Sequence, residues 1–128
     1  MKLDHEFVRK LLINFEKCTD INGISEQSLK KVADDCGKNW DELCYTLEKL
    51  KEADFITTRI LYGSNVPVFI QKGNLTYNGH EFLDTIRDPK IWKKTKEIAH
   101  NFQSISLSEL SKIGATVLAD AVKHFLQH

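Results

Sequence analysis

The chain has 128 residues, of which 41% are hydrophobic, so its length fits one domain that can bury a core without disulfides or a structural metal. Its formal net charge is zero, with −3 over residues 1–54 and +3 over residues 55–100, and neither part makes a large basic field that would hold nucleic acid without sequence preference. No run of about 18 apolar residues predicts a membrane span, and the N-terminus has acidic residues where a signal peptide needs an apolar core, so we expect a cytoplasmic protein.

Two helices are predicted at the N-terminal end of the chain. In the first, from about residue 4 to residue 17, apolar residues recur at three- and four-residue spacing and therefore share one face of a helix. Asp4 is a natural N-cap for this helix, because its carboxylate can accept hydrogen bonds from the first free amides. The second helix is expected between Ser25, its N-cap, and Gly37, which stops it.

A third helix and a hairpin come next. Asn39 and Glu42 have the three-residue spacing of a capping box, which predicts a helix over about residues 40–53. Two runs rich in β-forming residues then follow, at 56–62 and 66–71, and Gly-Ser-Asn separates them. This pattern predicts a β-hairpin, which must lie on the helical core because an isolated hairpin is only marginally stable.

The remainder of the chain is predicted to be helical, with one sharp corner. Thr76 can cap a helix that must end at Asp88, because the residue before a proline is pushed out of the α region. Pro89 suits the first turn of the next helix. Ser106 and Glu109 form a second capping box, which begins the last helix. The broad apolar face of that helix comprises Leu107, Leu110, Ile113, Val117, Leu118, Ala121, Val122, Phe125 and Leu126.

This order of elements predicts a mainly α fold with a small β-hairpin, in the α+β class. Three helices, a hairpin and a further helix are the order of a winged helix, which is a helix-turn-helix domain with a β wing. We therefore expect a winged-helix-like domain over residues 1–88, with the wing at 56–75 and a helix at 76–88. A helical extension at 89–128 is expected to pack on this domain and is a candidate dimerisation element.

Residues 75–96 read Leu-Thr-x-x-Gly-His-Glu-Phe-Leu-Asp-x-Ile-Arg-Asp-Pro-x-x-Trp-x-Lys-Thr-Lys. This stretch resembles the hallmark of a family of unknown function, number 2513 in the domain-of-unknown-function series, and residues 1–9 and 47–56 extend the likeness. The resemblance implies a winged-helix-like fold and a phage or prophage setting, with no established activity to carry over. Asp54 departs from the family, whose members tend to have glycine there. An aspartate in a left-handed conformation would cost about 1 kcal/mol.

No pattern in the chain predicts an enzyme, a cofactor or a metal site. Gly-rich phosphate loops and the Gly-x-Ser-x-Gly nucleophile motif are absent from the sequence. His80 and Glu81 are adjacent, so on a helix their side chains diverge by about 100° and make a poor acid–base pair. The three cysteines, Cys18, Cys36 and Cys44, lack CxxC spacing and are expected to be reduced thiols packed against apolar neighbours.

The outer face of the third helix is the main candidate for binding a protein partner. In a winged helix this face enters the major groove of DNA, yet here it has four acids against one lysine, which is the wrong charge for phosphates. We therefore expect a non-catalytic phage or prophage accessory protein that binds a host or phage protein, in regulation of host transcription or antagonism of host defence. The alternative for the face itself is a solvated helix surface. The candidate contact residues are Asp41, Glu42, Tyr45, Glu48, Lys49 and Glu52.

DNA binding remains the alternative function, as a winged-helix transcription regulator. Basic residues gather on the wing and around the Asp88-Pro89 corner, where they could contact a duplex backbone, although such a run is more often a solvated lysine face. The candidate DNA contacts are Arg59, Lys72, Arg87, Lys90, Lys93 and Lys94.

The last helix predicts a homodimer. Its apolar face is broader than one face of a surface helix usually needs, so part of it is expected to pair with a second copy, with a simple core helix as the alternative. The expected interface residues are Val117, Ala121, Val122, Phe125 and Leu126.

Overall fold

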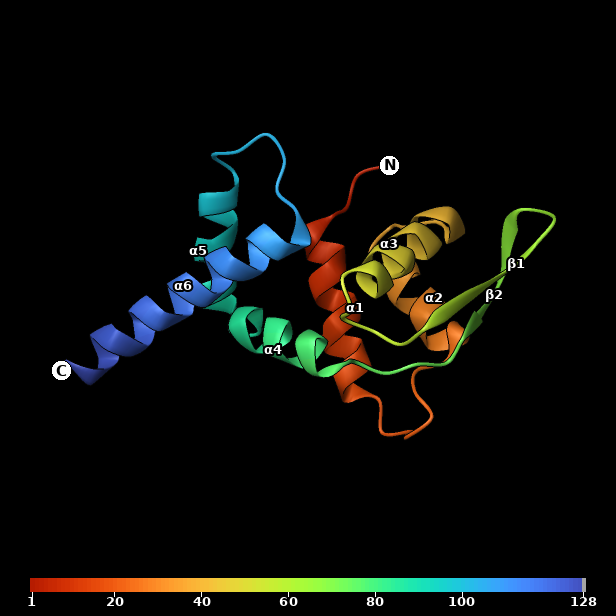
Figure 1. Ribbon diagram of the computed structural model, residues 1–128, viewed down its shortest axis with the longest axis horizontal. Coiled ribbons are helices and arrows are strands. Elements are labelled where there is room, and N and C mark those ends of the chain that lie inside the picture. The colour runs from red at the N-terminus through yellow and green to blue at the C-terminus, as the bar shows by residue number, and fades with distance from the viewer. Residues whose placement is uncertain (128) are drawn as a thin grey trace. The chain divides into compact units, whose positions relative to one another are not determined.

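A computed structural model describes residues 1–127 of the chain and contains, in that range, six helices and one two-stranded hairpin (Figure 1). In chain order they are α1 (His5–Lys17), α2 (Glu26–Asp35), α3 (Trp40–Glu52), β1 (Arg59–Gly63), β2 (Val66–Gln71), α4 (Tyr77–Ile86), α5 (Pro89–Ala99) and α6 (Leu107–Leu126). The predicted fold class, mainly α with a small antiparallel hairpin, is confirmed. The chain divides into two compact units, residues 1–80 and 81–128, at a point inside α4.

The first unit has a core made by one face of each of its first three helices. Each helix is held at its start by the cap that the sequence predicts: Asp4 accepts the amides of Glu6 and Phe7, at 2.9 and 3.2 Å, and Ser25 accepts the amide of Ser28 at 3.2 Å. The inward residues at three- and four-residue spacing are buried: Phe7, Val8, Leu11, Leu12 and Phe15 of α1, Leu29, Val32 and Ala33 of α2, and Leu43, Cys44, Leu47 and Leu50 of α3.

The hairpin is fixed to the helices through β2. Ile60 pairs with Ile70, and both side chains are buried. The amide of Ile70 donates to the carboxylate of Glu26 in α2 at 2.8 Å, and the indole N–H of Trp40 in α3 donates to the carbonyl of Pro67 at 3.1 Å. β1 begins three residues later than predicted, because Ile56 forms an isolated bridge with Leu75 instead of joining the ladder between β1 and β2.

The passage from α3 into the hairpin brings Asp54 and Phe55 against the start of α4. Asp54 has a φ of 62°, the left-handed conformation for which glycine is the easiest residue. Its carbonyl accepts the hydroxyl of Thr76, and the carbonyl of Phe55 accepts the amide of Thr76 at 3.0 Å. Thr76 also caps α4 by accepting the amide of Gly79 at 3.0 Å, as its position before the helix predicts.

The second unit begins within α4 and contains α5 and α6. Asp88 ends the corner after α4 and caps α5 by accepting the amides of Lys90 and Ile91, at 2.7 and 3.3 Å, with Pro89 in the first turn. Ser106 caps α6 by accepting the amide of Glu109 at 3.0 Å. α6 packs on α5, and its buried residues are Leu107, Leu110, Gly114 and Val117.

The last two turns of α6 extend beyond α5 (Figure 1). Val117 is only 6% exposed, so it belongs to the core of its own chain and is removed from the expected dimer interface. The other expected interface residues are exposed: Val122 by 49%, Phe125 by 81% and Leu126 by 76%, with Ala121 beside them. None of the helices within residues 1–127 is both long and apolar enough to cross a membrane.

Candidate functional site

The outer face of α3 is the surface that the sequence singles out, and its first turn is tightly organised. Asn39 accepts the amide of Glu42 at 2.8 Å, and the carboxylate of Glu42 accepts the amide of Asn39 at 3.2 Å, which completes the predicted capping box. Lys38 also lies 3.8 Å from this carboxylate. The carboxylate of Glu42 is therefore bound to the N-terminal end of its own helix and to Lys38. It contributes less unpaired negative charge to the outer face than the sequence alone indicates.

Farther along the same face, its single lysine, Lys49, is already paired with a carboxylate. The ammonium of Lys49 donates to Glu52 at 3.0 Å and lies 5.5 Å from the centre of the Tyr45 ring. The hydrogen bond to Glu52 raises the pKa of Lys49. Asp41 is exposed and Glu48 is half-buried, so the carboxylates of this face outnumber its one cation, which is already paired.

The hairpin adds an aromatic residue that sequence reasoning missed. The pKa of Tyr62 in β1 is raised, first by partial burial and then by the negative charge of Glu48. β1 contacts α3, and the Tyr62 side chain is 54% exposed. We call the set Asp41, Tyr45, Glu48, Glu52 and Tyr62 the α3–hairpin surface. The packing of β1 against α3 could not be predicted from the sequence, because it depends on tertiary contacts and not on the spacing of residues within either element.

Apolar side chains of the hairpin also face solvent. Leu61 pairs with Phe69 across the two strands on the side away from buried Ile60 and Ile70. These two side chains, together with Tyr62, Val66 and Val68, are exposed. Large apolar and aromatic side chains gathered at a surface are typical of binding sites for other proteins.

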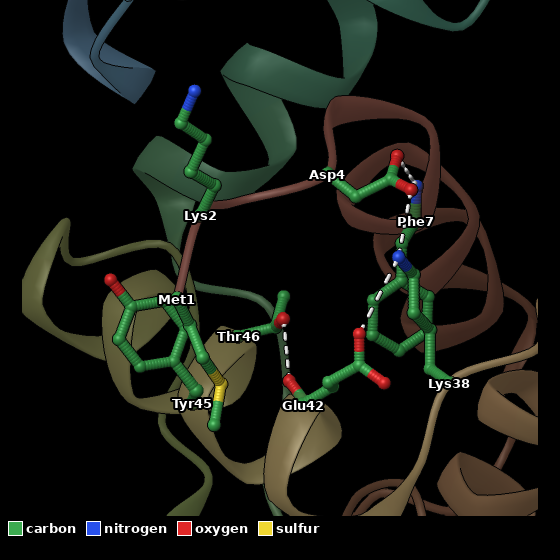
Figure 2. Close-up of a pocket in the computed structure, with 8 residues that line it drawn as sticks. All are labelled: Met1, Lys2, Asp4, Phe7, Lys38, Glu42, Tyr45 and Thr46. Carbon is green, nitrogen blue, oxygen red and sulfur yellow. Dashed lines mark hydrogen bonds and ion pairs between the residues drawn. The ribbon is translucent and has the colours of Figure 1, made fainter.

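A small pocket opens beside the acidic face, between the N-terminal end of α1 and α3 (Figure 2). Its volume is about 150 Å³, and its lining is Met1, Lys2, Asp4, Phe7, Lys38, Glu42, Tyr45 and Thr46. In Figure 2, Met1 and Tyr45 lie at one side of the pocket, and Asp4 and Lys38 lie at the other. Pockets for small ligands are usually about 300 to 1,000 Å³, so this one has the size for a single side chain.

Asp4, Lys38 and Glu42 form a network of ion pairs at the pocket. Lys38 lies 3.0 Å from the Asp4 carboxylate, which also caps α1. Partial burial opposes the ionisation of Asp4, but the hydrogen bonds from Lys38 and from the amides of Phe7 and Glu6 outweigh it and lower its pKa. Thr46 donates its hydroxyl to the carbonyl of Glu42 at 2.7 Å. The charge of each of Asp4, Lys38 and Glu42 is therefore paired within the pocket.

The residues considered for DNA binding are spread over both units. In the first unit, Arg59 is exposed on β1, and Lys72 lies 3.0 Å from Asp20, so its charge is balanced. In the second unit, Arg87 lies 2.7 Å from Asp84. Lys90, Lys93 and Lys94 are exposed around the start of α5.

The groups that could carry other chemistry are also placed by the structure. His80 and Glu81 are both exposed on α4. Cys44 is buried, and burial, followed by the charge of Asp41, raises its pKa from 9.0 to about 11, so it is a thiol at neutral pH. Among residues 1–127, no group of three or more His, Cys, Asp or Glu side chains could hold a metal ion.

The comparison with protein families matches most of the chain. The family described as "Hypothetical protein (DUF2513)" matches residues 2–106. The chain belongs to this family. The match takes in α1 to α5 and ends at Ser106, the N-cap of α6. No curated protein and no solved structure matches the chain.

Proposed function

We propose that this protein is a non-catalytic accessory protein that acts by binding another protein through the α3–hairpin surface. The observation that carries the proposal is the charge of the outer face of α3: the carboxylates of this face outnumber its one lysine, Lys49, and Glu52 already pairs with that lysine. A DNA-reading helix needs donors for phosphates and base edges, and this face offers mainly acceptors. A partner with a basic surface fits this charge.

The exposed side chains of the hairpin support the same proposal. Tyr45 lies on the same face of α3 as the carboxylates, and the charge of Glu48 acts on Tyr62 of the hairpin. Leu61 and Phe69 add exposed apolar area on the hairpin. Aromatic residues are enriched in protein–protein interfaces because they bury a large area and keep a polar end for a hydrogen bond. An acidic rim around aromatic anchors therefore suits a basic protein surface better than a duplex.

We further propose a winged-helix-like arrangement for the first unit and a phage or prophage setting. The order of three helices, a hairpin and a helix supports the first, and the family resemblance supports the second. A winged-helix scaffold with an acidic third helix would keep the shape of a DNA-binding domain and change its target to protein. Modulation of host transcription and antagonism of host defence are both compatible with this activity.

The test is affinity capture from a bacterial host lysate with three forms of the full chain. The wild type is compared with a Glu48→Lys, Glu52→Lys variant of the candidate surface. The matched control is Asp34→Lys, Asp35→Lys, which makes the same change in net charge on exposed positions of α2. Specific partner recovery is expected to fall at least about tenfold with the first variant and to stay near the wild-type level with the control. Equal recovery with all three would remove this surface from consideration.

A mobility shift assay separates this proposal from DNA binding. Random duplex and duplex from the cognate genome are mixed with micromolar protein at about 50 mM salt, where even non-specific DNA-binding proteins bind measurably. No shift is expected. A shift whose strength falls steeply with added salt, and which Arg59→Ala weakens, would replace protein binding with a transcription regulator as the proposed function.

A further inference from the structure

An apolar groove of about 570 Å³ runs along the C-terminal half of α6. Thr85 of α4 lies at one wall, and Ala115, Leu118, Ala119, Val122 and Leu126 line the groove along α6. This stripe is turned away from Val117, which is buried against the chain's own core. The groove is therefore additional apolar surface, separate from the face of α6 that completes the unit.

The residues on this side of α6 have the spacing of a helix-pairing seam. Ala115, Leu118, Val122 and Phe125 are separated by three, four and three residues, which is the repeat that keeps side chains facing a neighbouring helix in a coiled coil. Phe125 is 81% exposed at the end of this seam, because α6 has by then run beyond its neighbours. The seam thus has one small residue, Ala115, at one end and the protruding ring of Phe125 at the other.

We infer that a second copy of this chain fills the groove, with the two α6 helices antiparallel. In this arrangement Phe125 of each copy lies over Ala115 of the other, and Leu118 of each copy packs on Val122 of the other. Each of the four contacting residue pairs is a layer of the interface. Because the largest residue of the seam packs on the smallest, the four layers have similar total side-chain volume. Parallel pairing would place Phe125 on Phe125 and Ala115 on Ala115, which crowds one end and leaves a void at the other.

The charges of the helix fit the same pairing. The positions that flank the seam near its middle are Ala119 and Ala121, whose small side chains let two backbones approach. Asp120 lies on the opposite side of the helix from the seam, and Lys123 lies at the rim of the groove, so no two like charges face each other inside the interface. If the partner helix had a charged residue in its seam, that charge would be buried without a counter-charge, because the seam of α6 has only apolar residues.

The area is enough for a weak dimer. The four seam residues and Leu126, counted in both copies, bury on the order of 1,000 Å², which is near the lower limit for a specific interface. We therefore expect a monomer–dimer equilibrium in the micromolar range, and an isologous two-fold pair is the commonest form of such an assembly.

The test uses the full chain at about 100 μM in sedimentation equilibrium, with circular dichroism to check that each variant is folded. The wild type is expected to be dimeric. Phe125→Glu and Ala115→Lys alter exposed positions, so each variant is expected to fold and to be monomeric, with dimerisation weakened at least about tenfold. Thr116→Glu introduces a charge on the other side of the helix and is expected to leave the dimer intact.

Mixing the two variants tests the antiparallel order. In that order Lys at position 115 of one copy faces Glu at position 125 of the other, so an equimolar mixture is expected to recover the dimer. In a parallel pair these positions never meet, and the mixture would stay monomeric, which would overturn the proposed order. A wild type that is monomeric at about 100 μM, or a Phe125→Glu variant that is folded and still dimeric, would overturn the interface itself.

Discussion

Gly79 lies in the first turn of α4, where the helix passes very close to the carbonyl of Phe55. A Cβ atom added to Gly79 would lie 2.1 Å from that oxygen. Ordinary carbon–oxygen contacts are about 3.3 Å, so Gly79→Ala must move the start of the helix by about 1 Å. The same carbonyl accepts the amide of Thr76 at 3.0 Å, and the neighbouring Asp54 carbonyl accepts its hydroxyl.

Such a shift would weaken both hydrogen bonds that Thr76 donates to the carbonyls of Phe55 and Asp54. Each contributes about 1 kcal/mol, and the forced displacement of packed backbone adds about 1 to 3 kcal/mol. Alanine gains about 1 kcal/mol over glycine from helix propensity, which offsets part of this cost. We therefore expect Gly79→Ala to lower the free energy of unfolding by about 2 to 4 kcal/mol.

Urea denaturation followed by circular dichroism measures this change directly. The control is His80→Ala, one residue along the same helix at an exposed position, for which a change within about 0.5 kcal/mol is expected. The reasoning is refuted if Gly79→Ala is as stable as the wild type, because helix propensity would then outweigh a contact that the structure places far inside the ordinary limit.

Three further changes test other local features. Thr58 has a buried hydroxyl with no hydrogen-bond partner among residues 1–127, so Thr58→Val is expected to stabilise the chain by about 1 kcal/mol in thermal denaturation. Asp54→Gly relieves the left-handed backbone but loses the hydrogen bond from Asn78 at 3.0 Å, and a net gain of about 0.5 kcal/mol in urea denaturation is expected. The pKa of Asp4 is lowered below its ordinary value of 3.8, so its contribution is present above that pH and is lost as the pH falls below it. Asp4→Asn keeps a good N-cap, and the loss of stability as the pH falls below about 4 should be smaller in this variant than in the wild type.

The helix starts were predictable because they depend on residues close together in the sequence. Asp4, Ser25, Asn39 and Ser106 each cap the helix that their spacing predicts. The start of β1 was predicted three residues too early, because its position depends on contacts made far along the chain. Gly73 packs so closely on Thr58 that any side chain there would overlap it, and this contact has no local signal in the sequence.

The negative charge of the candidate site could be predicted from the sequence, but the full set of residues that form the site could not. Helical spacing alone placed Asp41, Glu48 and Glu52 on one side of α3, and the structure has them there. The capping role of Glu42 follows from its spacing to Asn39. The effect of Glu48 on the pKa of Tyr62 joins residues of different elements and has no local signal in the sequence. The same reason explains Val117: the periodicity of α6 gives its apolar face but not where the neighbouring helices end.

The contacts that hold β2 also limit how this protein can aggregate. A two-stranded hairpin has two open edges, and an open edge is a template on which strands of other chains can add. Along the outer edge of β2, the indole N–H of Trp40 donates to the carbonyl of Pro67, and the amide of Ile70 donates to the carboxylate of Glu26. Just after the strand, Gly73 forms an antiparallel bridge with Ile24. Pro67 has no amide to offer. An incoming strand therefore finds no continuous row of free groups there, and growth of a sheet from this side would first require the hairpin to detach from α2 and α3.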